Sequence, residues 1–256
     1  MTQASARELS GMKVAVLGST SGIGRAVALA LASGGADVIV HGHTSRDRAE
    51  EVANLARLEG VRSAVLMADL ADRAAGDALV EAAWDHWGGL DAWLQIAGAD
   101  TLTGASGKQP FDAKLDRLWA VDVVATIRLC RLVGRKMVKQ GSGSIVTTGW
   151  DQAETGMEGD SGELFAATKG AIMAFTRSLS LSLAPHVRVN NLAPGWIKTA
   201  WGDTASTPWQ DRVIRETPLA RWGTPNDVAQ AARFLVGPAS SFLTGQVLRV
   251  NGGVVR

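Results

Sequence analysis

The chain has 256 residues, of which 46% are hydrophobic and 20% are charged, as is typical of a globular protein with a well-filled core. Its 26 lysines and arginines nearly balance its 25 aspartates and glutamates, which argues against nucleic acid or an anionic membrane surface as a partner. Because no stretch approaches the roughly 20 apolar residues that cross a bilayer, and the opening segment lacks a signal peptide's apolar core, we expect a cytoplasmic protein.

Short β-rich runs alternate with longer segments rich in Ala, Leu and Arg along the whole chain. This order predicts a three-layer α/β fold, with a Rossmann-like, doubly wound parallel sheet of about seven strands between two layers of helices. Strands are expected at residues 13–17, 36–41, 62–67, 90–96, 144–148, 187–192 and 246–250. Helices are expected, among other places, at residues 22–32, 46–58, 112–139, 163–183 and 225–235. No repeat or linker marks a second domain, so we expect a single domain over residues 1–256.

Two segments that follow predicted strands look like functional loops, at residues 150–162 and 196–212. Ligands of open parallel sheets bind beyond the carboxyl ends of the strands, where both segments are expected. Residues 151–163 hold five carboxylates and no basic residue. One of these carboxylates could donate a proton or bind a cationic substrate, or the run could be a solvated loop with a helix start.

Three tryptophans, Trp196, Trp201 and Trp209, crowd the second of these segments. Aromatic faces suit a flat, polycyclic or cationic ligand. The alternative is a lid that packs on itself or on a partner subunit, because tryptophan is enriched at interfaces.

The first predicted strand runs into a glycine-rich turn in which Gly18, Gly22 and Gly24 follow the pattern GxxxGxG, with Ser21 and Ile23 beside them. Glycines between a strand and a helix let backbone N–H groups approach a pyrophosphate. A plain strand-to-helix turn would show the same residues, so the turn alone does not decide the function.

The GxxxGxG spacing and several later motifs resemble those of the short-chain dehydrogenase/reductase family, and the resemblance covers nearly the whole chain. The matching segments stand after the third and fourth predicted strands, where the family contacts adenine and the dinucleotide, and after the sixth, where it flanks the nicotinamide. The residues that the resemblance assigns to the cofactor there are Asp69, Leu70, Ala97, Gly98, Pro194, Gly195 and Thr199. The resemblance therefore implies an NAD(P) site.

The segment after the second predicted strand carries no acidic residue that would accept the ribose hydroxyl of NAD. It offers His43, Thr44 and Arg46 to a 2′-phosphate instead, which favours NADP. Two observations leave NAD open: Arg46 could simply begin a solvated helix, and Ser21 stands where many NADP-preferring relatives carry an arginine.

The resemblance also shows which catalytic side chains differ from the family's usual set. Phe165 occupies the tyrosine position of the family's Tyr-x-x-x-Lys motif, Lys169 is retained, and Trp150 occupies the position of the catalytic serine. A phenyl ring cannot transfer a proton, and an indole cannot act as a general base. The chain therefore reads as a divergent member that lacks the catalytic Ser and Tyr, although a shift of one or two residues would bring Thr147 or Thr148 to the serine position.

Asp122 stands where the family has an asparagine, and with Lys169 it could form an ionic pair that passes a proton through water. Such a pair is similar to what some dienoyl-CoA reductases of this superfamily use. The alternative is structural: Lys169 also binds the nicotinamide ribose in the family, and Asp122 could simply neutralise it.

The leading hypothesis is an NADP-dependent reductase of a carbonyl, enone or imine in a small, aromatic or polycyclic molecule, with a proton donor other than tyrosine. The missing hydroxyls also suit a non-redox enzyme, such as a dehydratase, isomerase or cyclase, or a catalytically silent cofactor-binding subunit. Relatives commonly form homodimers or homotetramers through two long helices, which match residues 112–139 and 163–183. We expect a homo-oligomer without a metal site.

Overall fold

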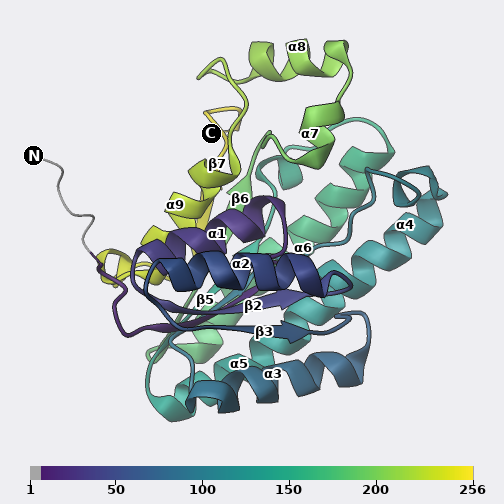
Figure 1. The fold of residues 1–256 in the computed structure, drawn as a ribbon. Coiled ribbons are helices and arrows are strands. Elements are labelled where there is room, and N and C mark those ends of the chain that lie inside the picture. Colours follow the sequence, from purple (N-terminus) through teal and green to yellow (C-terminus); the bar gives the residue numbers. More distant parts are fainter. Residues whose placement is uncertain (1–6, 256) are drawn as a thin grey trace, which may run out of the picture.

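A computed structural model of the chain describes residues 7–255, whose strands form one seven-stranded parallel sheet (Figure 1). The strands are β1 (Lys13–Leu17), β2 (Asp37–Gly42), β3 (Ser63–Met67), β4 (Ala92–Gln95), β5 (Gly143–Thr148), β6 (Val187–Pro194) and β7 (Val247–Val250). Their order is β3-β2-β1-β4-β5-β6-β7, so β1 lies between β2 and β4 and the winding reverses there. The doubly wound Rossmann-like fold is confirmed, and its ligand crevice is expected beyond the carboxyl ends of β1 and β4.

Helices cover both faces of the sheet, and each face has its own apolar core. One face carries α1 (Gly22–Ser33), α2 (Arg46–Leu58) and α9 (Pro225–Val236), and the other carries α3 (Arg73–Trp87), α5 (Ala125–Gln140) and α6 (Asp160–Leu183). Both faces of β1 are therefore covered, which explains why VAVL in this strand is apolar at successive positions and fully buried.

The long helix expected over residues 112–139 is interrupted. α4 (Phe111–Leu118) is followed by the π-helical segment η2 (Trp119–Val124), and only then does α5 begin. A π-helical turn holds one more residue than an α-helical turn, which changes the face on which the next side chains emerge. Asp122 lies within this turn and is buried, so the irregular segment sets the direction of a predicted catalytic side chain.

The two segments expected as loops contain short helices. Residues 196–212 include α7 (Ala200–Thr204) and most of α8 (Thr207–Glu216), which stand beyond the sheet at the top of Figure 1. Pro208 in the first turn of α8 suits a helix start because its ring fixes a helical φ. Residues 150–162 include the 3-10 turn η3 (Asp151–Ala153) and the first residues of α6. Both segments follow strands, as expected, and the short helices within them were not predicted.

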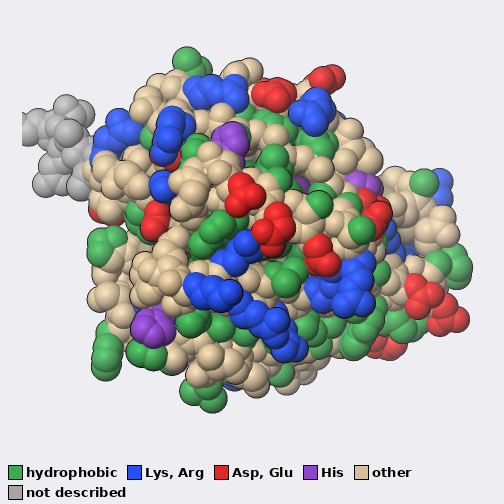
Figure 2. Space-filling view, turned by 90° about the horizontal axis from the view of Figure 1, so that it is seen from below, with side chains coloured by type: hydrophobic (Ala, Val, Ile, Leu, Met, Phe, Trp, Pro, Cys, Tyr) green, Lys and Arg blue, Asp and Glu red, His purple; other side chains and the backbone are tan. Residues whose placement is uncertain are grey.

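The surface carries charges of both signs. Basic and acidic side chains are interspersed on the face shown in Figure 2, as the near-balance of charges predicts. Within residues 7–255, no helix has the length and apolarity needed to span a membrane. The same described residues hold no group of three or more His, Cys, Asp or Glu side chains placed to bind a metal ion.

Candidate cofactor cleft and active site

A cleft of about 890 Å³ opens beyond the carboxyl ends of β1 and β4. Its walls come from the glycine turn, from the segments that follow β2, β3 and β4, and from α4 and α7. Most of the residues that the resemblance assigns to the cofactor line it: Gly18, Ser21, Gly22, Ile23, Gly24, His43, Thr44, Asp69, Leu70, Ala97, Gly98 and Thr199. These residues come from five separate parts of the chain, which thus meet in one cavity.

The glycine turn is too tightly packed to hold side chains at two of its positions. A Cβ on Gly18, where φ is +75°, would lie 2.6 Å from the Cα of Ala97, and a Cβ on Gly24 would lie 2.1 Å from the Gly18 carbonyl oxygen. Ser21 precedes α1 without forming a side-chain cap, so no capping hydrogen bond occupies the N–H groups of the first turn. These groups and the helix dipole are available to a phosphate.

The His41 side chain holds the glycine turn through a hydrogen bond, a role that could not be predicted from the sequence. The Gly18 N–H donates to His41 Nδ1 at 3.1 Å, so this nitrogen is the acceptor and Nε2, 3.2 Å away from the Ala68 carbonyl oxygen, carries the proton. Burial lowers the pKa of His41 to about 4, and the ring is neutral at physiological pH. Only this neutral tautomer, on β2, can accept from Gly18 after β1 and donate to Ala68 after β3.

The end of the cleft beside His43 and Asp69 carries both charge signs. His43 Nε2 lies 3.5 Å from one oxygen of Asp69, and Arg117 of α4 lies 3.8 Å from the other. Arg117 lines the cleft and was not anticipated from the sequence. Arg46 points to Glu50 on its own helix, 3.9 Å away, and does not line the cleft. Its position fits the solvated helix start rather than a 2′-phosphate contact.

Asp122 and Lys169 form a buried ion pair. Lys169 Nζ lies 2.7 Å from Asp122 Oδ2, and the side chains are 12% and 2% exposed. The Ala99 N–H donates to the other carboxylate oxygen at 2.7 Å. A Cβ on Gly98 would approach Asp122 Oδ2 to 3.0 Å, so this carboxylate packs directly beneath the segment that follows β4. The structure therefore brings η2 and α6 together behind the segment that follows β4, although neither Asp122 nor Lys169 itself lines the cleft.

Trp150 and Phe165 contact each other edge to face. Their ring centroids are 6.2 Å apart at an interplanar angle of 60°. Phe165 lies one helical turn before Lys169 on α6, as its place in the motif requires. Neither ring lines the 890 Å³ cleft, although Thr148 and Trp201 do.

The two threonines that a shifted register would bring to the serine position differ in burial. Thr147 is fully buried, and its hydroxyl bonds to Thr176 and Asn191. Thr148 lines the cleft and donates to the Gln95 carbonyl oxygen at 3.0 Å. Only Thr148 is placed to reach a ligand.

Two of the five carboxylates of residues 151–163 form ion pairs with arginines from distant parts of the chain. Glu154 accepts from Arg177 of α6 and from Arg249 of β7, and Glu158 accepts from Arg212 of α8. These interactions tie the segment to three elements, so it is held in place rather than simply solvated.

Asp151 differs from Glu154 and Glu158, because it is buried and its hydrogen-bond partner is an amide rather than a cation. It is fully buried and accepts one hydrogen bond, from Asn251 Nδ2 at 3.1 Å, while its Oδ1 has no partner within residues 7–255. Burial raises its pKa to about 6. A Cβ on Gly195 would lie 3.0 Å from Asp151 Oδ2, which places this carboxyl group under the Pro194–Gly195 turn.

The tryptophans of the second segment form one cluster together with Trp222. Trp196 stacks on Trp201 at a centroid distance of 6.2 Å, and Trp209 and Trp222 lie within 6.5 Å of both rings. The Arg212 guanidinium lies 4.9 Å above the Trp209 ring. Trp201 lines the cleft, so the cluster packs on itself and also presents one ring to a ligand.

Comparison with known proteins agrees with this geometry. Residues 18–255 match the family model described as enoyl-(acyl carrier protein) reductase. The chain is 30% identical over 243 residues to a 3-oxoacyl-(acyl-carrier-protein) reductase FabG of Staphylococcus aureus, covering 93% of this chain and 96% of the relative. It is 35% identical over 249 residues to the short-chain reductase protein NovJ of Streptomyces niveus, covering 93% and 92% of the two chains.

Solved structures show the same fold. A 7α-hydroxysteroid dehydrogenase in complex with NADH and 7-oxo glycochenodeoxycholic acid aligns with a TM-score of 0.88 at 29% identity, over 100% of this chain and 98% of the other. A gluconate 5-dehydrogenase from Burkholderia cenocepacia in complex with NADP and tartrate aligns with a TM-score of 0.86 at 27% identity, over 97% and 96% of the two chains. The chain belongs to the short-chain dehydrogenase/reductase family of oxidoreductases.

Proposed function

We propose that the chain is an NADP-dependent reductase of a carbonyl, enone or imine, in which Asp122 and Lys169 replace the family's tyrosine as the source of the proton. The observation that carries the proposal is the buried ion pair between these side chains, 2.7 Å apart, beneath the segment that lines the cleft. Reduction of a double bond needs a hydride and a proton. A bound nicotinamide supplies the hydride, so the protein has to supply or relay the proton.

The cleft fits a dinucleotide by its shape and its donors. The turn at Gly18 and Gly24 has no room for a Cβ, and the first turn of α1 has no side-chain cap. A pyrophosphate accepts hydrogen bonds from such N–H groups. Two solved relatives hold NADH and NADP, which supports the same class of ligand here.

We infer that the adenosine lies at the end of the cleft beside His43 and Asp69, and three features of this end support NADP over NAD. No acidic residue follows β2 to accept the ribose hydroxyl, while His43 and Thr44 line the cleft there. Arg117 of α4 adds a guanidinium to the same end of the cleft. Asp69 already pairs with both His43 and Arg117, so a 2′-phosphate would have to compete with this carboxylate for them.

Both oxygens of the Asp122 carboxylate are engaged, which fixes the position of Lys169. Asp122 is locked by the Ala99 N–H on one oxygen and by Lys169 on the other. Lys169 is 12% exposed, so water can reach the ammonium group while the carboxylate stays buried. We propose that the lysine donates through such a water to the substrate and regains its proton from solvent.

The aromatic side chains support a flat substrate. Trp201 lines the cleft, and the Trp150–Phe165 pair follows Thr148, which also lines it. Aromatic faces and a largely apolar pocket suit an aromatic or polycyclic molecule.

The test is to titrate the protein with NADPH and NADH, and then to follow NADPH consumption over a panel of aromatic ketones, enones and imines. Lys169→Ala and Asp122→Asn are expected to lower kcat by about 10²- to 10⁴-fold, the usual contribution of a general acid. Binding of NADPH is measured separately for each variant, because Lys169 could also hold the ribose. A loss of affinity with unchanged kcat would assign the pair to cofactor binding and reject the proton relay.

One observation favours a second candidate, a catalytically silent cofactor-binding subunit. Trp150 and Phe165 contact each other where the family's two catalytic hydroxyls stand, and the cleft does not extend to either ring. A silent subunit would bind NADPH but consume none with any substrate of the panel. Phe165→Tyr combined with Trp150→Ser would then create turnover that the parent lacks, whereas the reductase proposal expects turnover in the parent.

We further propose that the protein is a homodimer or homotetramer. Trp119 and Val124 of η2 are 44% and 42% exposed beside a shallow apolar hollow between α4, α5 and α6. Exposed aromatic and aliphatic side chains on a helical face are typical of subunit interfaces. Size-exclusion chromatography with light scattering gives the oligomeric state, and Trp119→Glu is expected to weaken the assembly.

A further inference from the structure

A second cavity, of about 470 Å³, lies on the far side of the Trp196 segment from the cofactor cleft. It is enclosed by the start of that segment, by residues 217–223 and by residues 249–253 at the end of β7. Of the described residues, none lines both this cavity and the cleft. It is therefore a separate hollow, which the proposed reductase reaction does not use.

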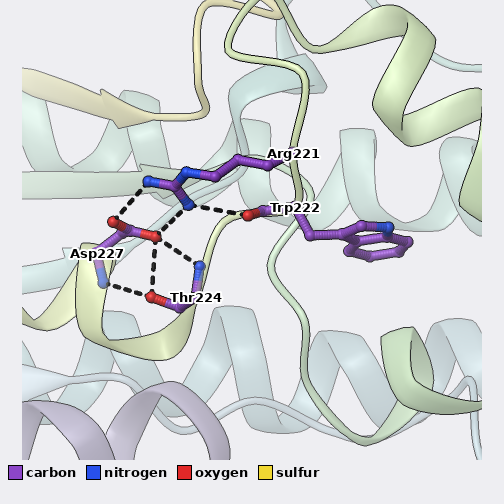
Figure 3. A network of polar contacts seen from close by, with 4 residues as sticks. All are labelled: Arg221, Trp222, Thr224 and Asp227. Atoms are coloured by element: carbon purple, nitrogen blue, oxygen red, sulfur yellow. Dashed lines mark hydrogen bonds and ion pairs between the residues drawn. The ribbon is translucent and has the colours of Figure 1, made fainter.

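Arg221 is held in a fixed orientation at this cavity (Figure 3). Its Nη1 donates to the Trp222 carbonyl oxygen at 2.9 Å and to Asp227 Oδ2 at 2.8 Å, and its Nη2 donates to Asp227 Oδ1 at 3.0 Å. Asp227 also accepts from the Thr224 N–H at the start of α9. The guanidinium holds the pKa of Asp227 well below its usual range. Three of the five N–H donors of Arg221 are used in this way, and two are left over.

Other polar atoms of the cavity wall lack partners. The Arg249 guanidinium is anchored by Glu154, yet its Nε is buried and has no hydrogen-bond partner in the described part of the chain. The same is true of Thr217 Oγ1 and Trp196 Nε1, and Thr217 is only 5% exposed. Buried polar groups without partners are unfavourable, so this wall is incomplete on its own. Indole and guanidinium N–H groups only donate, so the missing partner must accept.

The remaining side chains of the wall are mostly apolar, namely Ile197, Pro218, Leu219 and Val250. The charged residues of the lining are Arg221, which is paired with Asp227, and Arg249, which is paired with Glu154 just outside the lining, so the lining itself holds one more positive than negative charge. The nearest further carboxylates, Asp151 and Glu154, accept from Asn251 and from two arginines. We propose that this cavity binds a small monocarboxylate with an apolar body, the carboxylate oxygens accepting from Arg221, Arg249 and Thr217.

The position of the cavity connects it to the cleft. Trp196 lines the cavity and stacks on Trp201, which lines the cleft, with the two indole planes 29° apart. A ligand in the cavity therefore contacts the segment that also contributes Trp201 to the wall of the cofactor cleft. The proposal does not depend on the reductase activity, because binding is measured on the protein without cofactor.

The test uses benzoate as the probe and benzamide as its neutral counterpart, with binding measured by calorimetry and by ligand-observed NMR. We expect benzoate to bind with one site per chain, and benzamide to bind at least tenfold more weakly, as expected for the loss of a charge-assisted contact. Arg221→Gln and Arg249→Gln are each expected to weaken benzoate binding about tenfold. Leu219→Trp fills the cavity from an exposed position, where folding is least disturbed, and should abolish binding.

Arg62→Gln is the matched control. Like Arg221, Arg62 forms an ion pair with one aspartate, Asp37, but at an exposed site outside the cavity. It should bind benzoate like the parent. The proposal is overturned if benzoate does not bind, if benzamide binds equally well, or if Leu219→Trp leaves binding unchanged. Displacement of benzoate by NADPH with no effect of the cavity variants would place the probe in the cofactor cleft and would equally reject the proposal.

Discussion

Asp151 gives a pH-dependent stability that can be worked out from the structure. The carboxyl group is fully buried, has one hydrogen bond from Asn251, and has a pKa raised from 3.8 to about 6. Desolvation is the largest cause, and the hydrogen bond from Asn251 and the charge of Arg249 partly oppose it. Because the folded protein holds this proton more tightly than the unfolded chain, the stabilisation is fully present below about pH 4 and is lost as the pH rises through about 6.

The size of the effect follows from the shift. A difference of about two pKa units corresponds to about 3 kcal/mol of unfolding free energy between the protonated and ionised forms. Asp151→Asn cannot ionise, and its amide can still accept from Asn251. We therefore expect the variant to match the parent at about pH 4 and to be more stable by up to about 3 kcal/mol at about pH 8.

The measurement is urea unfolding of the parent and the variant at a series of pH values between about 4 and about 8. Because both proteins share all their other titratable groups, the contributions of those groups cancel in the difference between the two unfolding free energies. Asp85→Asn, at an exposed position on α3, is the matched control and should show a difference near zero throughout. A stability difference between Asp151→Asn and the parent that stays constant with pH would refute the argument, since the carboxyl group would then not titrate in this range.

Three further predictions follow from the core, the turn and the ion pair. Leu129→Ala should lower the free energy of unfolding by about 2–5 kcal/mol in urea titration, because the side chain is fully buried beneath the sheet. Gly24→Ala should weaken NADPH binding about tenfold or more in calorimetry, with the fold retained in circular dichroism, because the added Cβ would meet the Gly18 carbonyl. Lys169→Met should destabilise the protein by about 3–5 kcal/mol, since it leaves the Asp122 carboxylate buried without its cation, and Lys169→Arg should recover part of this loss.

The sheet could be predicted from the sequence because its strands are apolar at successive positions. A run such as VAVL in β1 must be covered on both faces, and only a parallel sheet between helices provides that. The strand ends in the structure differ from the predicted ends by one or two residues, and β6 extends to Pro194. The π-helical turn could not be foreseen, since the apolar periodicity of residues 112–139 is compatible with a continuous helix.

The candidate site was predictable where motifs fix positions close together in sequence, as in the glycine turn and in the spacing from Phe165 to Lys169. It was not predictable where a role depends on a partner far along the chain. His41 acts through Gly18 and Ala68, and Arg117 reaches Asp69 from another helix. The acidic run seemed free of basic neighbours only because Arg177, Arg212 and Arg249 come from three later elements.

The choice between a reductase and a silent subunit also depends on residues that are far apart in the sequence. A buried ion pair gives little net stability, because desolvation of both charges offsets their attraction. A π-helical turn is likewise rare within helices and occurs most often at functional sites. Here both features meet at Asp122, next to the segment that lines the cleft. Packing alone would be served as well by apolar side chains on a regular helix, so this coincidence favours a chemical role for Asp122 and Lys169.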